Sequence, residues 1–209
     1  MLSWLWPVGI AKAEGRHGDL EVRYEAGGLV LNSRNGNQSF GSLHRVWQHV
    51  FAHIGLKDRP PANVLLLGLG GGSVPTILRN ELGLPAPITA VEIDPAMIEL
   101  GRKYFDLGAH IALELVAADA TLHVHTDTKR YELVVVDLFD DLDLARGVET
   151  MGFAHALRDR CGGTLCFNTV AYDALSGVRC QRVRDNLGKV FPSVDELVLE
   201  GVNRVFIAR

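Results

Sequence analysis

An aliphatic run that ends in glycines constrains the fold of this chain more than any other feature. Residues 64–78 read VLLLGLGGGSVPTIL, so four branched-chain residues lead into Gly68, Gly70 and Gly72 and then into a helix-like segment. A continuous apolar run is typical of a parallel strand that is covered on both faces. Glycines at the next turn let a ligand approach the backbone, and the N–H groups of a helix start favour electron-rich ligands. The segment therefore predicts an α/β fold with a ligand site at this turn.

Strand-like and helix-like segments alternate after this turn. The expected strands are 63–69, 88–93, 112–118, 131–139 and 162–170, and the expected helices are 74–82, 94–105, a short one after 119, 149–160 and 176–190. Two further strand-like segments, 194–200 and 203–209, are joined by two residues, which suits an antiparallel hairpin. The pattern predicts an open, doubly wound, mostly parallel α/β sheet with a C-terminal antiparallel hairpin. Such sheets bind ligands at the carboxyl ends of their strands.

The chain before this sheet has a different pattern. Residues 20–40 alternate like short strands and include a turn signal at Asn35–Gly36. Residues 42–56 place apolar residues at helical spacing, and a Pro-Pro pair then ends the unit. We therefore divide the chain into a small N-terminal β segment plus helix, 1–60, and the doubly wound domain, 61–209.

The composition excludes several classes of partner. Of the 209 residues, 47% are hydrophobic and 22% are charged, which is ordinary for a soluble globular protein. The net charge of −4 and the pI near 6.0 give no electrostatic reason to expect nucleic acid or an anionic membrane. No apolar run approaches the length that spans a bilayer. A small molecule remains the expected partner.

The N-terminal residues and the cysteines bear on the compartment. A short apolar stretch precedes Ala11-Lys12-Ala13, but it lacks a positively charged start and includes Pro7, so a signal peptide is the weaker interpretation. Cys161, Cys166 and Cys180 are odd in number and show no C-x-x-C spacing. This usage favours core residues of a reducing compartment over a disulfide frame or a zinc site. We expect a cytoplasmic protein.

Acidic residues follow the glycine turn at the ends of successive strands. Glu92 ends the second strand, Asp119 follows the third and Asp137 ends the fourth. Each acid alone is most often a helix cap or a solvated strand end. Together with the glycine turn they predict a nucleoside site, with Glu92 where an acid accepts hydrogen bonds from ribose hydroxyls. A dinucleotide fingerprint would place a third glycine at Ser73, and a phosphate-binding Walker loop would need a lysine that is absent.

The histidine pairs predict no metal site. His49 and His53 are four residues apart but fall on the polar face of the 42–56 helix and lack an obvious third ligand. His123 and His125 have no partner cluster either. Solvated histidines are the better interpretation of all four.

With these motifs the sequence resembles the spermidine synthase family, a branch of the Rossmann-like S-adenosylmethionine methyltransferase fold. The resemblance runs from about Leu20 to the C-terminus. Its motifs appear in order as Gln38, the glycine loop LLLGLGGG, VEID with Glu92 and Asp94, Asp119-Ala120, and DLFDD with Asp137 and Asp140.

The resemblance implies a co-substrate, a reaction and a set of site residues. The co-substrate would be S-adenosylmethionine or decarboxylated S-adenosylmethionine, with no metal, and the reaction would transfer an aminopropyl group to a small amine. Glu92 would bind the ribose, Ile93 would pack on the adenine, and Asp137 would take the proton of the attacking amine, which Asp140 would hold. The resemblance also implies a homodimer. The implied donor-binding residues are Gln38, Gly68, Gly70, Gly72, Glu92, Ile93, Asp119, Ala120 and Asp137.

The chain departs from this family where the amine would bind. Gly71 stands where the family carries an acid that grips the aminopropyl ammonium, and Asp141 replaces a proline. The positions that usually hold further acids and a tyrosine are here Leu43, His44, Trp47 and His49. A cationic amine would therefore meet fewer carboxylates. Two alternatives stay open, a methyltransferase on the same fold and a catalytically silent nucleoside-binding protein.

Overall fold

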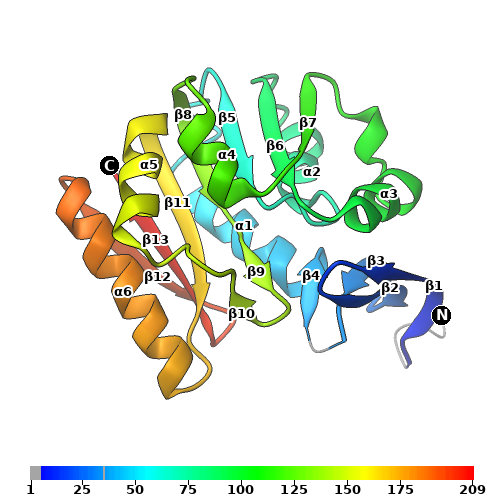
Figure 1. Ribbon diagram of the computed structural model, residues 1–209. Helices are drawn as coiled ribbons and strands as arrows, with labels where there is room; N and C mark the ends of the chain where they lie inside the picture. Colours follow the sequence, from blue (N-terminus) through cyan, green and yellow to red (C-terminus); the bar gives the residue numbers. More distant parts are fainter. Residues whose placement is uncertain (1–5, 35) are drawn as a thin grey trace.

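The structure, a computed structural model, describes residues 6–34 and 36–209. Residues 1–5 of the predicted N-terminal segment and Asn35 of the predicted turn lie outside the described residues. The described chain forms a large seven-stranded sheet, a four-stranded sheet and a two-stranded ribbon. Figure 1 shows the four-stranded sheet beside the carboxyl edge of the large one.

The large sheet has the predicted doubly wound topology. Its strands, in spatial order, are β12 (Val194–Leu199), β13 (Asn203–Ala208), β11 (Cys161–Val170), β8 (Tyr131–Val136), β5 (Val64–Leu67), β6 (Ile88–Glu92) and β7 (Leu113–Ala117). The strands from β11 to β7 pair in parallel. β13 pairs antiparallel with both β11 and β12, so the later strand of the predicted hairpin lies inside the sheet and β12 lies at its edge.

Helices cover both faces of this sheet (Figure 1). They are α1 (Gly41–His53), α2 (Ser73–Thr76), α3 (Pro95–Tyr104), α4 (Ala120–Thr126), α5 (Met151–Arg160) and α6 (Ala174–Val190), with a short 3₁₀ turn at Leu107–Ala109. Val64 and Leu66 belong to a buried cluster that includes residues of α1 and α2, while Leu65 and Leu67 belong to one that includes residues of α4, α5 and α6. This alternation explains why the strand reads as a continuous apolar run, because both of its faces are buried.

The predicted helix 74–82 is not one regular helix. α2 ends at Thr76, and the chain continues as a π-helical segment, Ile77–Glu81. The Arg79 guanidinium donates to the carbonyl oxygens of Leu84 and Ala86, at 2.5 and 2.6 Å. These bonds tie the wide turn to the loop that follows it.

The four-stranded sheet is an antiparallel meander. It consists of β1 (Val8–Gly15), β2 (Gly18–Glu25), β3 (Gly28–Asn32) and β4 (Asn37–Ser39). The sequence did not predict β1, because its inward face consists of small residues: Ala11 and Ala13 are only partly buried against the core of this sheet, and no residue of the strand is fully buried. Leu20, Val22 and Leu31 pack against Met97 and Leu100 of α3, which joins this sheet to the large domain.

α1 belongs to the core of the large sheet. The sequence groups this helix with the N-terminal segment, but Val46, Val50 and Phe51 share one buried cluster with β5, β6 and β8. Among the described residues no helix is long and apolar enough to cross a membrane. The three cysteines are free and buried, as their sparse spacing predicts.

Candidate functional site

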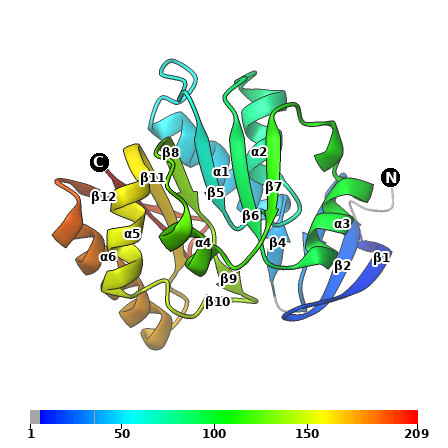
Figure 2. The same cartoon turned by 45° about the horizontal axis from the view of Figure 1, so that its top comes forward.

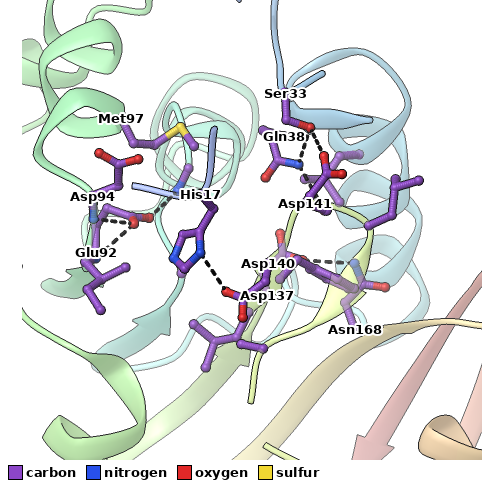
Figure 3. A pocket seen from close by; sticks show the side chains of 18 of the residues that line it. His17, Ser33, Gln38, Glu92, Asp94, Met97, Asp137, Asp140, Asp141 and Asn168 are labelled. Atoms are coloured by element: carbon purple, nitrogen blue, oxygen red, sulfur yellow. Dashed lines mark hydrogen bonds and ion pairs between the residues drawn. The ribbon is translucent and has the colours of Figure 1, made fainter. Parts of the chain in front are cut away.

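A pocket of about 370 Å³ opens where the carboxyl ends of β5, β6, β7, β8 and β11 meet. The β1–β2 turn and the ribbon of β9 (Phe139–Asp140) and β10 (Asp143–Leu144) contribute to its walls. Figure 3 shows Glu92, Asp94 and Met97 on one side of it and Asp137, Asp140 and Asn168 on the other. The predicted residues that line it are Gln38, Gly68, Gly70, Glu92, Ile93, Asp119, Ala120, Asp137 and Asp140.

The glycine loop brings bare backbone to the pocket at two of its three predicted positions. Gly68 and Gly70 have φ angles of 90° and 56°, which L side chains rarely adopt. A Cβ on Gly68 would also overlap the carbonyl oxygen of Asp137. Gly72 lies outside the pocket wall, and there a Cβ would lie 2.9 Å from Leu107. Gly72 was predicted to bind the donor, but in the structure it packs closely against the 3₁₀ turn instead of lining the pocket.

Glu92 holds the glycine loop in shape. One carboxylate oxygen accepts the backbone N–H groups of Leu69 and Gly70, at 3.1 and 3.0 Å. The other accepts those of Ile93 and Asp94, at 2.9 and 3.0 Å. Burial raises the pKa of Glu92, and the four backbone bonds oppose that shift. An ionised carboxylate has about four acceptor sites, and the four backbone N–H groups already use them. A ribose hydroxyl that bonds to Glu92 would therefore share an acceptor oxygen with a backbone N–H.

Asp119 caps α4 at the edge of the pocket. Its Oδ1 accepts the backbone N–H of Thr121 at 2.8 Å and the hydroxyl of Thr121 at 2.6 Å. The cap fixes the start of the helix, so Ala120 is buried and lines the pocket beside it. Ile93 lines the same pocket from the end of β6. Glu92, Ile93, Asp119 and Ala120 thus meet at neighbouring strand ends, as the sequence predicts for a nucleoside site.

Asp137 lies at the centre of the carboxyl edge and is bound by two neutral donors. Trp47 Nε1 donates to Oδ2 and Asn168 Nδ2 donates to Oδ1, both at 2.9 Å. The Oδ1 of Asn168 in turn accepts from Asn203 Nδ2 at 3.1 Å. Burial raises the pKa of Asp137 to about 6, although both hydrogen bonds lower it. A carboxylate with this pKa is ionised at neutral pH and can accept a proton.

The β1–β2 turn crosses the pocket and contacts both of its sides. The backbone N–H of Arg16 donates to Asp94 at 2.7 Å, and His17 Nδ1 lies 3.4 Å from Asp140 Oδ1. Figure 3 shows the His17 ring between the two groups of acids. Asp140, the predicted amine-holding residue, therefore has a histidine partner in this structure.

Gln38 links the four-stranded sheet to the loop after β9. Its Nε2 donates to Ser33 Oγ and to the carbonyl oxygen of Asp141, both at 3.1 Å. The Ser33 hydroxyl also donates to the Asp141 carboxylate. Asp141 has a positive φ of 60°, a conformation that proline cannot adopt. A proline at position 141, which the family carries, could therefore not adopt the backbone conformation that this loop has.

Position 71 faces away from the pocket. A Cβ on Gly71 would lie 3.1 Å from Leu31 and 3.2 Å from Ser39, and both of these residues are buried. Ser39 is also fixed by hydrogen bonds to Ser73. The space that an acid would need at Gly71 is thus filled by the four-stranded sheet.

Several residues at the site were not predicted to act there. His17, Asn168 and Asn203 line the pocket, and Trp47 bonds to Asp137 without lining it. Register would have pointed to Asn168, since Phe167 of β11 pairs with Val136 of β8 and the next residues are Asn168 and Asp137. Nothing in the sequence places the β1–β2 turn over the pocket. Among the described residues, no group of three or more His, Cys, Asp or Glu side chains could bind a metal ion. His49 and His53 are exposed.

The comparison with known families agrees with this geometry. The family described as the spermine/spermidine synthase domain matches residues 44–199, which is most of the chain. The chain belongs to this family.

Curated relatives of this family member come from two kinds of transferase. A polyamine aminopropyltransferase of Bacillus cytotoxicus is 34% identical over 115 residues, which are 52% of this chain and 41% of the relative. The eEF1A lysine and N-terminal methyltransferase of Danio rerio is 31% identical over 166 residues, 72% of this chain and 23% of the relative. The chain thus spans less than half of the length of either relative.

Solved structures show the same fold. A probable spermidine synthase from Corynebacterium glutamicum has a TM-score of 0.80 at 15% identity, over 95% of this chain and 79% of that one. Human Methyltransferase-like protein 13, solved in complex with SAH, has a TM-score of 0.65 at 22% identity, over 81% of this chain and 82% of that one. The architecture is therefore that of spermidine synthases and of related methyltransferases.

Proposed function

We propose that this chain is a spermidine synthase-like transferase that binds S-adenosylmethionine or its decarboxylated form and transfers an alkyl group to a small amine. Aminopropyl transfer is the first candidate. The observation that supports it is a single pocket that joins the glycine loop and Glu92 to Asp137, a carboxylate whose pKa lies near 6. A related spermidine synthase has been solved with the transition state analogue AdoDATO, and its fold superimposes with a TM-score of 0.71.

In this proposal the nucleoside lies over the ends of β5, β6 and β7, and the sulfonium carbon faces Asp137. The amine nitrogen attacks that carbon in line as the carbon–sulfur bond breaks, so the nucleoside leaves as a neutral thioether. The nitrogen gives up its proton to Asp137 and the proton then passes to water. Trp47 and Asn168 hold the carboxylate in place by their hydrogen bonds.

Methyl transfer is the second candidate, and one observation favours it. Position 71 faces Leu31 and Ser39, so the family's grip on an aminopropyl ammonium is missing there. Calorimetry with S-adenosylmethionine and its decarboxylated form separates the two candidates, because the tighter ligand identifies the donor. A protein that binds one of them but transfers nothing to any amine would be the silent alternative.

The nucleoside site is tested by a double-mutant cycle on the ribose. We expect 5′-methylthioadenosine to bind the parent protein about tenfold or more tightly than its 2′-deoxy analogue, because a hydrogen bond to a charged group contributes about 1.5–3 kcal/mol. The Glu92→Gln variant should bind both ligands with nearly equal, weaker affinity, measured by calorimetry. A circular dichroism spectrum checks that the variant is folded, since its amide would face two backbone N–H groups. If the variant discriminates between the ligands as the parent does, Glu92 does not contact the ribose.

A further inference from the structure

The order of strands divides the pocket into two ends on either side of Asp137. β8, which precedes Asp137, lies between β5 and β11 in the large sheet. The glycine loop, Glu92 and Asp119 follow β5, β6 and β7 on one side. On the other side lie the end of β11 and the start of β13, where Val170 pairs with Asn203. An acceptor that reaches Asp137 while the nucleoside occupies the first side must therefore lie on the second.

The side chains that line this second end carry no charge. They are Ser42, Leu43, Asn168, Val170, Val202 and Asn203. Leu43 lies one helical turn before Trp47 on α1, so it shares the face that approaches Asp137. Asn168 is fully buried, and its amide is used by Asp137 and Asn203.

The nearest acids, Asp140 and Asp141, belong to the β9–β10 ribbon and contact residues of the four-stranded sheet and its turns. Asp140 pairs with His17, and the carboxylate of Asp141 accepts the Ser33 hydroxyl. Arg146 follows the same ribbon and lines the pocket with a positive charge. A second ammonium group on a chain that runs along the β11–β13 edge would therefore lose its hydration without meeting a carboxylate among the side chains that line that edge. One ammonium, by contrast, matches the single carboxylate of Asp137.

We infer that the acceptor is a monoamine with an uncharged, largely apolar body, and not a diamine. This inference rests on the proposed function, because it assumes that the nucleoside occupies the other end of the pocket. The amine nitrogen lies at Asp137, and the carbon chain runs between Leu43 of α1 and Val170 and Val202 of the β11–β13 edge.

The test compares two amines of the same length on protein saturated with 5′-methylthioadenosine. n-Pentylamine and putrescine differ in that a terminal methyl group replaces the second ammonium. Calorimetry should show n-pentylamine binding about tenfold or more tightly than putrescine, since the second charge would be desolvated without a partner. Equal or tighter binding of putrescine overturns the inference, as does the failure of both amines to bind the saturated protein. Failure of 5′-methylthioadenosine itself to bind would instead overturn the proposed function.

A matched pair of variants locates the amine. Val202 is 39% exposed in the β12–β13 turn, so substitutions there do not enter the core. Val202→Glu should raise putrescine affinity relative to n-pentylamine by about tenfold, because it adds a carboxylate within the second end. Val202→Gln introduces a side chain of the same size as glutamate but without its charge. It should leave the ratio of putrescine affinity to n-pentylamine affinity within about twofold of the parent value. If Glu and Gln change the ratio equally, the chain of the amine does not lie against Val202 and the inferred path is wrong.

Discussion

Asp137 combines a central position with an environment that leaves it basic. Its partners are an indole and an amide, and no cation pairs with it among the described residues. Burial raises its pKa to about 6, whereas a salt bridge would have lowered it. The carboxylate is therefore a better proton acceptor than a solvated aspartate, yet it remains ionised at neutral pH.

This pKa gives a pH dependence for the transfer reaction. Activity should rise with pH through about 6 as Asp137 loses its proton, and Asp137→Asn should lose roughly 10²-fold or more in turnover. The measurement is kcat/KM against pH with whichever donor and amine are turned over. A fully active Asn variant would leave Asp137 with no role in the chemistry.

Trp47→Phe provides the control for that assignment. The indole hydrogen bond lowers the pKa of Asp137, so its loss should move the acid limb of the profile to higher pH. A purely structural effect would lower activity at every pH without moving the limb. Trp47 is fully buried, so the melting temperature of the variant is measured alongside.

At the scale of elements, the four-stranded sheet decides what the glycine loop can carry. β3 and β4 place Leu31 and Ser39 against Gly71, and Ser39 is bonded to Ser73 at the start of α2. The glycine loop is thus held by two elements: Glu92 accepts its backbone N–H groups, and the four-stranded sheet packs against Gly71. Its glycines serve two purposes, since Gly68 and Gly70 line the pocket while Gly71 and Gly72 pack closely against neighbouring elements.

Placing the family's acid at position 71 should therefore destabilise the protein without adding a contact to the donor. We expect Gly71→Asp to destabilise the protein by about 1–3 kcal/mol, or roughly 2–10 °C in melting temperature, because Leu31 and Ser39 cannot move freely. Gly71→Ala, the matched control, should show much of the same loss. Neither variant should gain affinity for decarboxylated S-adenosylmethionine by calorimetry. A tenfold gain in the Asp variant alone would show that position 71 reaches the ligand.

At the scale of the whole molecule, the pocket lies between two sheets that share a small core. Leu20, Val22 and Leu31 join the four-stranded sheet to α3, and Figure 2 shows α3 beside β1 and β2. The β1–β2 turn adds contacts to Asp94 and Asp140 across the pocket. A ligand in the pocket would contact both sheets at once.

Ligand binding should therefore stabilise both parts together. At a hundredfold excess of 5′-methylthioadenosine over its Kd we expect about 2.7 kcal/mol of added stability. Hydrogen exchange should slow at Arg16–Gly18 of the β1–β2 turn as well as in the glycine loop. Protection confined to the strand ends would mean that the turn does not cover the bound nucleoside.

The sequence by itself determined the architecture of the large domain and the residues that line the pocket at the ends of β5, β6 and β7. Apolar periodicity and glycine turns depend on neighbours along the chain, so they predicted the order of strands and helices and the positions of Glu92, Asp119 and Asp137. Parallel strands bring their carboxyl ends to one edge, which is why acids far apart in the sequence meet at one pocket.

The tertiary structure decided what each of these residues contacts. The inward face of β1 consists of the small residues Ala11 and Ala13, which give a weak apolar pattern, so neither the strand nor the position of His17 over the pocket followed from the sequence. The binding of Asp137 to Trp47 and Asn168, the packing of Gly71 on Leu31 and the exclusion of Gly72 from the pocket are contacts between distant segments. They depend on the register and packing of whole elements, which no local pattern encodes.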